Sequence, residues 1–114
     1  FPTRRSSDLV DLCKRNAARL DLPQEHFLAL KADALNPPSP PEDHKVSLVF
    51  IDPPYGKNLV VSAVKALQES DWLDQEYWLV LEIGAKDTHP GIDARLRADK
   101  IYGHTRILIY SGET

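Results

Sequence analysis

The chain has 114 residues, 42% of them hydrophobic and 27% charged, which is typical of one small globular domain and too polar for a membrane protein. A net charge of −3 argues against electrostatic nucleic-acid binding by this chain alone. Cys13 is the only cysteine, which excludes an internal disulfide and a cysteine-rich zinc site. No apolar run could span a membrane and no secretory signal is visible, so we expect a cytoplasmic protein without a membrane partner.

The first nine residues, FPTRRSSDL, lack the apolar periodicity of the segment that follows them. This string resembles the translation of a common sequencing-library adapter, and the chain contains no methionine. We therefore expect residues 1–9 to be a non-native segment. Residues 10–114 would then be the C-terminal part of a single, N-terminally truncated domain.

Apolar residues at steps of three and four predict an amphipathic helix over Val10–Leu20, ended by Leu22-Pro23. His26–Ala32 is expected to be a short strand ending at Asp33. Residues 36–43 include four prolines and are predicted to form a loop.

Val46–Ile51 has the strongest strand pattern in the chain, because only Ser47 is polar. Such a run predicts a strand covered on both faces, as in a parallel sheet. Helical spacing follows over Leu59–Leu67, and a second apolar strand is expected over Tyr77–Ile83.

The rest of the chain is more polar. A short helix is expected around Ile92–Ala98, and an antiparallel pair of strands is expected over Ile101–Tyr110, turning at Gly103-His104. Alternation of buried strands with helices predicts an α/β fold with a mainly parallel sheet and a C-terminal antiparallel hairpin.

Asp52-Pro53-Pro54-Tyr55 follows the strongest strand directly. Ligands of open parallel sheets bind at the carboxyl ends of the strands, which makes this group the first candidate for chemistry. The Asp52 carboxylate and the Pro53 carbonyl could each accept an N–H from an amino group, hold its nitrogen in line with a methyl donor and stabilise the positive charge that develops. The two prolines present only acceptors, and Tyr55 offers a ring for stacking a flipped-out base.

Other interpretations stay open at each candidate position. The same four residues could form a rigid turn in which Asp52 caps the next helix. Asp33 could accept from an adenine amino group or cap a turn, and Glu82 is expected to be a strand-end carboxylate without chemistry. The four histidines have no spacing suited to a metal, so no metal site is predicted.

The segment Leu48–Leu59, the strand Tyr77–Glu82 and the ending Tyr102-Gly-His-Thr-Arg106 together resemble the RsmD-type methyltransferases. The resemblance covers residues 10–112. It implies a Rossmann-like class I methyltransferase fold. It also implies an enzyme that uses S-adenosylmethionine to methylate the N2 amino group of a guanine in 16S ribosomal RNA. The partner would be the small ribosomal subunit or its assembly intermediate. The sequence does not determine the oligomeric state, and a monomer is the simplest expectation.

By this resemblance, Asp52, Pro53, Pro54 and Tyr55 match the catalytic motif. Asp33-Ala34 lies where the family places its adenine-proximal acidic residue. The family's glycine-rich cofactor loop and its basic RNA-binding segment would lie upstream of residue 10, so we expect this chain by itself to bind cofactor poorly and to be inactive.

Three alternatives remain. The motif also occurs in amino methyltransferases that act on DNA adenine or protein glutamine. A receiver-like signalling domain would make Asp52 a phosphoacceptor, although the other residues it needs are not found after Tyr77–Glu82. A binding-only module would use the same residues without methyl transfer.

Overall fold

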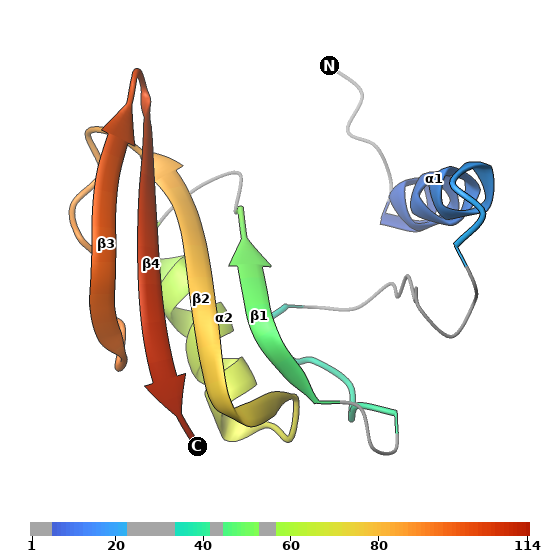
Figure 1. The fold of residues 1–114 in the computed structure, drawn as a ribbon, viewed down its shortest axis with the longest axis horizontal. Coiled ribbons are helices and arrows are strands. Elements are labelled where there is room, and N and C mark those ends of the chain that lie inside the picture. The colour runs from blue at the N-terminus through green and yellow to red at the C-terminus, as the bar shows by residue number, and fades with distance from the viewer. Residues whose placement is uncertain (1–5, 23–33, 42–44, 53–56) are drawn as a thin grey trace. The chain divides into compact units, whose positions relative to one another are not determined.

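The computed structural model describes residues 6–22, 34–41, 45–52 and 57–114, and it divides the chain into two compact units, Phe1–Asp33 and Ala34–Thr114. The elements in chain order are α1 (Ser6–Arg19), β1 (Val46–Ile51), α2 (Lys57–Glu69), β2 (Leu73–Gly84), β3 (Arg95–Tyr102) and β4 (Thr105–Glu113) (Figure 1). The strand expected over His26–Ala32 lies outside the described residues. In the described part of the chain, neither helix has the length and apolarity needed to cross a bilayer.

Helix α1 belongs to the first unit and begins at Ser6, four residues before the predicted start. It ends at Arg19, one residue before the predicted end. The N–H of Leu22 donates to the carbonyl of Ala17 at 3.0 Å, and that of Asp21 donates to Ala18 at 3.1 Å. Asp21 has a φ of 54°, so this helix ends in a Schellman turn with aspartate in the left-handed position that glycine usually occupies.

The second unit contains one sheet with the strand order β1-β2-β4-β3. β1 and β2 are parallel, and β4 is antiparallel to both β2 and β3. The expected antiparallel pair at the end of the chain is confirmed, but its first strand begins at Arg95. The helix expected around Ile92–Ala98 is wrong, because Arg95–Tyr102 pairs along β4 and the chain before it completes the connection from β2.

Helix α2 packs against one face of this sheet (Figure 1). Alternate residues of the two central strands face it and are completely or almost completely buried. Six side chains form the centre of the core: Val60 and Val64 of α2, Leu79 and Leu81 of β2, and Leu108 and Tyr110 of β4. Burial of such side chains contributes about 1.5–3 kcal/mol each, which makes this layer the main source of stability.

On the opposite face of the sheet, β1 presents apolar side chains that are exposed within the described structure. Leu48 and Phe50 are 65% and 62% exposed, and they pair in register with Trp78 and Val80. β1 therefore forms where the sequence predicts it, but the prediction that both its faces are covered is wrong for the described residues. Within β1, the residues that pack against the core beneath α2 are Val46, Val49 and Ile51.

Gly112 provides a test of packing at the amino end of β2. Tyr77 pairs with Gly112, and a Cβ at position 112 would lie 2.4 Å from two atoms of the tyrosine side chain. Gly112→Ala should therefore force the buried Tyr77 to move and should lower the free energy of unfolding by about 1–3 kcal/mol, measured by urea denaturation. Gly91→Ala is the control, because nothing lies within 4 Å of its Cβ position, and equal stability losses in the two variants would contradict the prediction.

A candidate active-site edge of the sheet

Asp52 is the candidate catalytic residue that the structure describes. It follows β1 directly and is exposed. β1 and β2 run in the same direction, so Asp52 lies at the edge of the sheet where both strands have their carboxyl ends, at the top of Figure 1. We call this side the carboxyl edge. Pro53, Pro54 and Tyr55 lie outside the described residues, and their roles remain predictions from the sequence.

Glu82 is the nearest acidic neighbour of Asp52 in the strand register. Ile51 pairs with Leu81, so Asp52 and Glu82 are the next residues along their strands. β2 continues to Gly84, which means that Glu82 lies within the strand and not at its end as predicted. Leu81 is buried in the core, so alternation places the half-buried Glu82 on the face opposite α2.

Of the two residues expected on the adenine side of the cofactor, Asp33 and Ala34, the structure describes one. Asp33 lies outside the described residues, and Ala34 lies in an exposed turn. The proline-rich loop that follows has no helix or strand over residues 36–41 apart from a single bridge residue, as predicted. The indole N–H of Trp72 donates to the Pro38 carbonyl at 2.6 Å and so fixes this loop near the start of β2.

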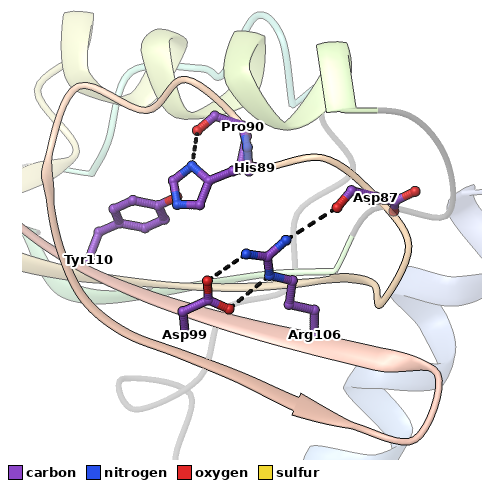
Figure 2. A network of polar contacts seen from close by, with 6 residues as sticks. All are labelled: Asp87, His89, Pro90, Asp99, Arg106 and Tyr110. Carbon is purple, nitrogen blue, oxygen red and sulfur yellow. Dashed lines mark hydrogen bonds and ion pairs between the residues drawn. The ribbon is translucent and has the colours of Figure 1, made fainter.

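A polar network joins three segments at the carboxyl edge (Figure 2). The Arg106 guanidinium donates to both carboxylate oxygens of Asp99, at 2.8 and 2.5 Å, and to the Asp87 carbonyl at 3.3 Å. The Asp87 carboxylate accepts the N–H of Gly84 at 2.8 Å. These contacts tie β3 and β4 to the turn after β2, and sequence reasoning missed them because they depend on the register between distant strands.

His89 and Tyr110 fasten the connection between β2 and β3 to the core side of the sheet (Figure 2). His89 Nδ1 lies 2.9 Å from the Pro90 carbonyl, which can only accept, so Nδ1 carries the proton. In the neutral ring, Nε2 then accepts from the Tyr110 hydroxyl at 3.3 Å. Burial raises the pKa of Tyr110, so its hydroxyl keeps the proton that it donates.

The described cavities lie away from Asp52, near the amino end of β2. One of about 340 Å³ lies beside α2, where Gln68 Nε2 donates to Tyr77 Oη at 3.1 Å and to the Asp93 carbonyl at 2.9 Å. The residues that line the two described cavities do not include Asp52. Among the residues with described positions, no cluster of three or more His, Cys, Asp or Glu could hold a metal ion.

The arrangement of strands is that of a methyltransferase fold. It is similar to that of the Escherichia coli protein yhhF, named as a methyltransferase, with a TM-score of 0.74, 20% identity, and coverage of 92% of this chain and 59% of that one. The Haemophilus influenzae protein HI0767, named as a methylase, gives a TM-score of 0.77, 21% identity, and coverage of 94% and 68%. The expected Rossmann-like α/β methyltransferase fold is therefore confirmed.

Comparison of sequences places the chain within a family. Residues 4–111 match the sequence model of the family described as Conserved hypothetical protein 95, and the chain belongs to this family. The Rickettsia prowazekii protein named "Uncharacterized methylase RP545" is 34% identical over 64 residues, which are 54% of this chain and 27% of that protein. The chain thus spans about a quarter of this relative and 59% of the E. coli structure.

The ion pair between Asp99 and Arg106 should make stability depend on pH. The hydrogen bond from Arg106 lowers the pKa of Asp99 below its ordinary value of 3.8, so the pair stabilises the fold above that pH and the contribution disappears as the pH falls through the lowered pKa. Asp99→Asn should be less stable than the unmodified protein at pH 7 in urea denaturation. The difference in free energy of unfolding between the two proteins should disappear only below pH 3.8.

Lys65→Gln is the control for this measurement, because Lys65 and Glu69 form an exposed pair with a separation of 4.0 Å. Exposed pairs of this kind contribute little to stability. The stabilising role of the Asp99–Arg106 pair would be contradicted if Asp99→Asn were as stable as the unmodified protein at pH 7. It would also be contradicted if the difference in stability disappeared well above pH 3.8.

Proposed function

We propose that the protein transfers a methyl group from S-adenosylmethionine to the exocyclic N2 amino group of a guanine in 16S ribosomal RNA. The substrate would be the small ribosomal subunit or its assembly intermediate. One observation carries the proposal: the first residue of the Asp-Pro-Pro-Tyr motif, Asp52, is exposed at the carboxyl edge of a parallel strand pair. This is the position at which open α/β sheets bind their ligands.

The chemistry assigned to Asp52 is hydrogen-bond acceptance. The lone pair of an exocyclic amino nitrogen is delocalised into the ring, so the nitrogen is a poor nucleophile. A carboxylate that accepts one N–H orients the nitrogen and stabilises the positive charge that develops as its bond to carbon forms. In the proposal, the Pro53 carbonyl accepts the second N–H, Pro54 keeps the backbone rigid, and the Tyr55 ring stacks on the flipped-out base.

S-adenosylmethionine would supply an electrophilic methyl group. The sulfur–methyl bond would break as the nitrogen–carbon bond forms, S-adenosylhomocysteine would be the leaving group, and the methylated nitrogen would lose one proton to solvent after the transfer. We propose Asp33 and Ala34 as residues on its adenine side, as the sequence resemblance implies. The described cavities lie near the amino end of β2 and do not include Asp52, so they do not fit a donor that must reach this residue. The role assigned to the described part of the chain is therefore confined to the acceptor nitrogen.

The sheet topology favours methyl transfer over the signalling alternative. Receiver-like domains have a parallel doubly wound sheet, whereas β4 here runs antiparallel between β2 and β3. Family membership favours methyl transfer as well. Methylation of DNA adenine or of protein glutamine would use the same motif, and the choice of ribosomal RNA rests on the resemblance of the flanking segments.

Asp52→Ala in the whole gene product should lower kcat for methyl transfer by about 100-fold or more, because a preorganised group that stabilises the developing charge is removed. Asp52→Asn keeps one acceptor oxygen and should retain part of the activity. The assay follows transfer of labelled methyl from S-adenosylmethionine to small ribosomal subunits. Asp74→Ala, which removes an exposed carboxylate near the amino end of β2, is the matched control.

The substrate is tested with the same protein by offering small subunits, DNA and a protein release factor in parallel. Mass spectrometry of digested product should find N2-methylguanosine in the RNA and no methylation of the other two. Methyl transfer that is unchanged in Asp52→Ala would refute the acceptor role. If the product is methyladenine in DNA or methylglutamine in protein, the proposed substrate is wrong, whereas the assignment of methyl transfer to an amino group still holds.

A further inference from the structure

The turn of the β3–β4 hairpin lies at the same carboxyl edge as Asp52. β3 runs parallel to β1 and β2, so the hairpin turns at the top of Figure 1, where the arrowheads of β1 and β2 point. Gly103 has a φ of 62°, a left-handed conformation that makes this turn tight. Tyr102, which precedes it, is 66% exposed.

The register places the Tyr102 side chain on the same face of the sheet as Glu82. Tyr102 pairs with Thr105, and Lys100 pairs with Ile107, which in turn pairs with Glu82. Paired residues share a face and alternate residues return to it, so Tyr102, Lys100 and Glu82 all lie on the face opposite α2. Asp52 is next to Glu82 in the register, three strands away from Tyr102.

Two lysines accompany this tyrosine along the edge. Lys100 lies in β3, and Lys86 lies in the turn after β2, and both are exposed. Neither forms an ion pair with any residue that the structure describes. The Asp99 carboxylate binds Arg106 and the Asp87 carboxylate accepts the Gly84 N–H, so neither is free to pair with these lysines. Glu82 lies on the same face as Lys100, and β4 separates the two residues.

The hairpin is held firmly against the end of β2. The N–H of Ala85 donates to the His104 carbonyl at 2.8 Å, and Arg106 bridges Asp99 and the Asp87 carbonyl. Tyr102 and Lys86 are thus carried on segments that hydrogen-bond to each other. A preorganised edge of this kind loses little conformational entropy when it binds a ligand.

We propose that Tyr102, Lys100 and Lys86 bind the single-stranded RNA that flanks the target nucleotide. This inference rests on the proposed function and deepens it. The Tyr102 ring stacks on an unpaired base, and the two ammonium groups contact backbone phosphates, which is the combination that proteins use for single-stranded nucleic acid. Three strand spacings of about 4.8 Å, and an offset of two residues of about 3.3 Å each along the strands, separate Asp52 from Tyr102. This distance is roughly five stacked nucleotides at 3.4 Å each.

Binding of a protein-free 16S RNA transcript by the whole gene product tests the proposal. Tyr102→Ala should weaken the Kd by about tenfold, the effect typical of removing one stacked base, whereas Tyr102→Phe should bind like the unmodified protein. Lys86→Gln with Lys100→Gln should reduce the slope of log K against log salt by about 1.4, or 0.7 for each phosphate that is no longer neutralised. Lys65→Gln, on the exposed side of α2, should change neither quantity.

Methyl transfer separates this inference from the proposed function. In Tyr102→Ala, KM for RNA should rise while kcat at saturating RNA and the binding of S-adenosylhomocysteine stay unchanged, because Tyr102 does not touch the reacting atoms. If the unmodified protein methylates no RNA, the proposed function fails. If it methylates RNA and both variant sets bind the transcript normally, only the RNA-binding role of the hairpin is overturned.

One outcome would point to another occupant of this edge. Variants that bind the transcript normally but bind whole small subunits weakly would show that the hairpin contacts a ribosomal protein, and would overturn the proposal. Unfolding by urea is measured in parallel. Because Tyr102 is 66% exposed, Tyr102→Ala should remain folded. If Tyr102→Ala unfolds, RNA binding is judged from Tyr102→Phe, which keeps the aromatic ring.

Discussion

The pairing of β4 with β2 is the constraint on which the rest of the described structure depends. The pairing extends from Glu76–Glu113 to Gly84–Thr105, and the alternate residues along it that face α2 include Leu79, Leu81 and Leu108, each with 0% exposure. Because β4 occupies the position beside β2, the chain after β2 must cross to the far side of β4 before β3 can begin. That crossing brings His89 to Tyr110 and the Asp87 carbonyl to Arg106, and so it shapes the carboxyl edge.

The parts of the fold that sequence reasoning predicted are those with strong local signals. Val46–Ile51 forms a strand with the predicted bounds, since a run of β-branched and aromatic residues ended by two prolines has no other good conformation. Only the end of β3, Ile101–Tyr102, is predicted from the sequence. Arg95, Arg97, Asp99 and Lys100 make the rest of the strand as polar as a loop, and a register shift between Leu96 and Ala98 breaks its alternation. Such an edge strand is stabilised by pairing with β4 rather than by its own apolar content.

The candidate site shows the same division. Asp52 was found from the sequence because chemistry and position are both local: a carboxylate, two prolines and an aromatic ring follow a buried strand directly. The contribution of β3 and β4 to this edge was beyond sequence reasoning, since it arises from which residues pair across strands that are distant in the chain. The net charge of −3 gives no information on where individual charges lie. Lys86 and Lys100 lie at the carboxyl edge, and neither forms an ion pair with a described residue.

The two outer strands of the described sheet differ in how they present themselves to solvent. β3 carries alternating charged side chains, which discourage pairing with another strand, whereas β1 has an apolar sequence, one described strand partner, and Leu48 and Phe50 exposed on the open face. Unpaired backbone groups beside an exposed apolar surface are a template for strand addition. When the chain is prepared by itself, self-association should therefore begin at β1, and a charged or proline substitution at Ser47 would be the first change to make when solubility is limiting.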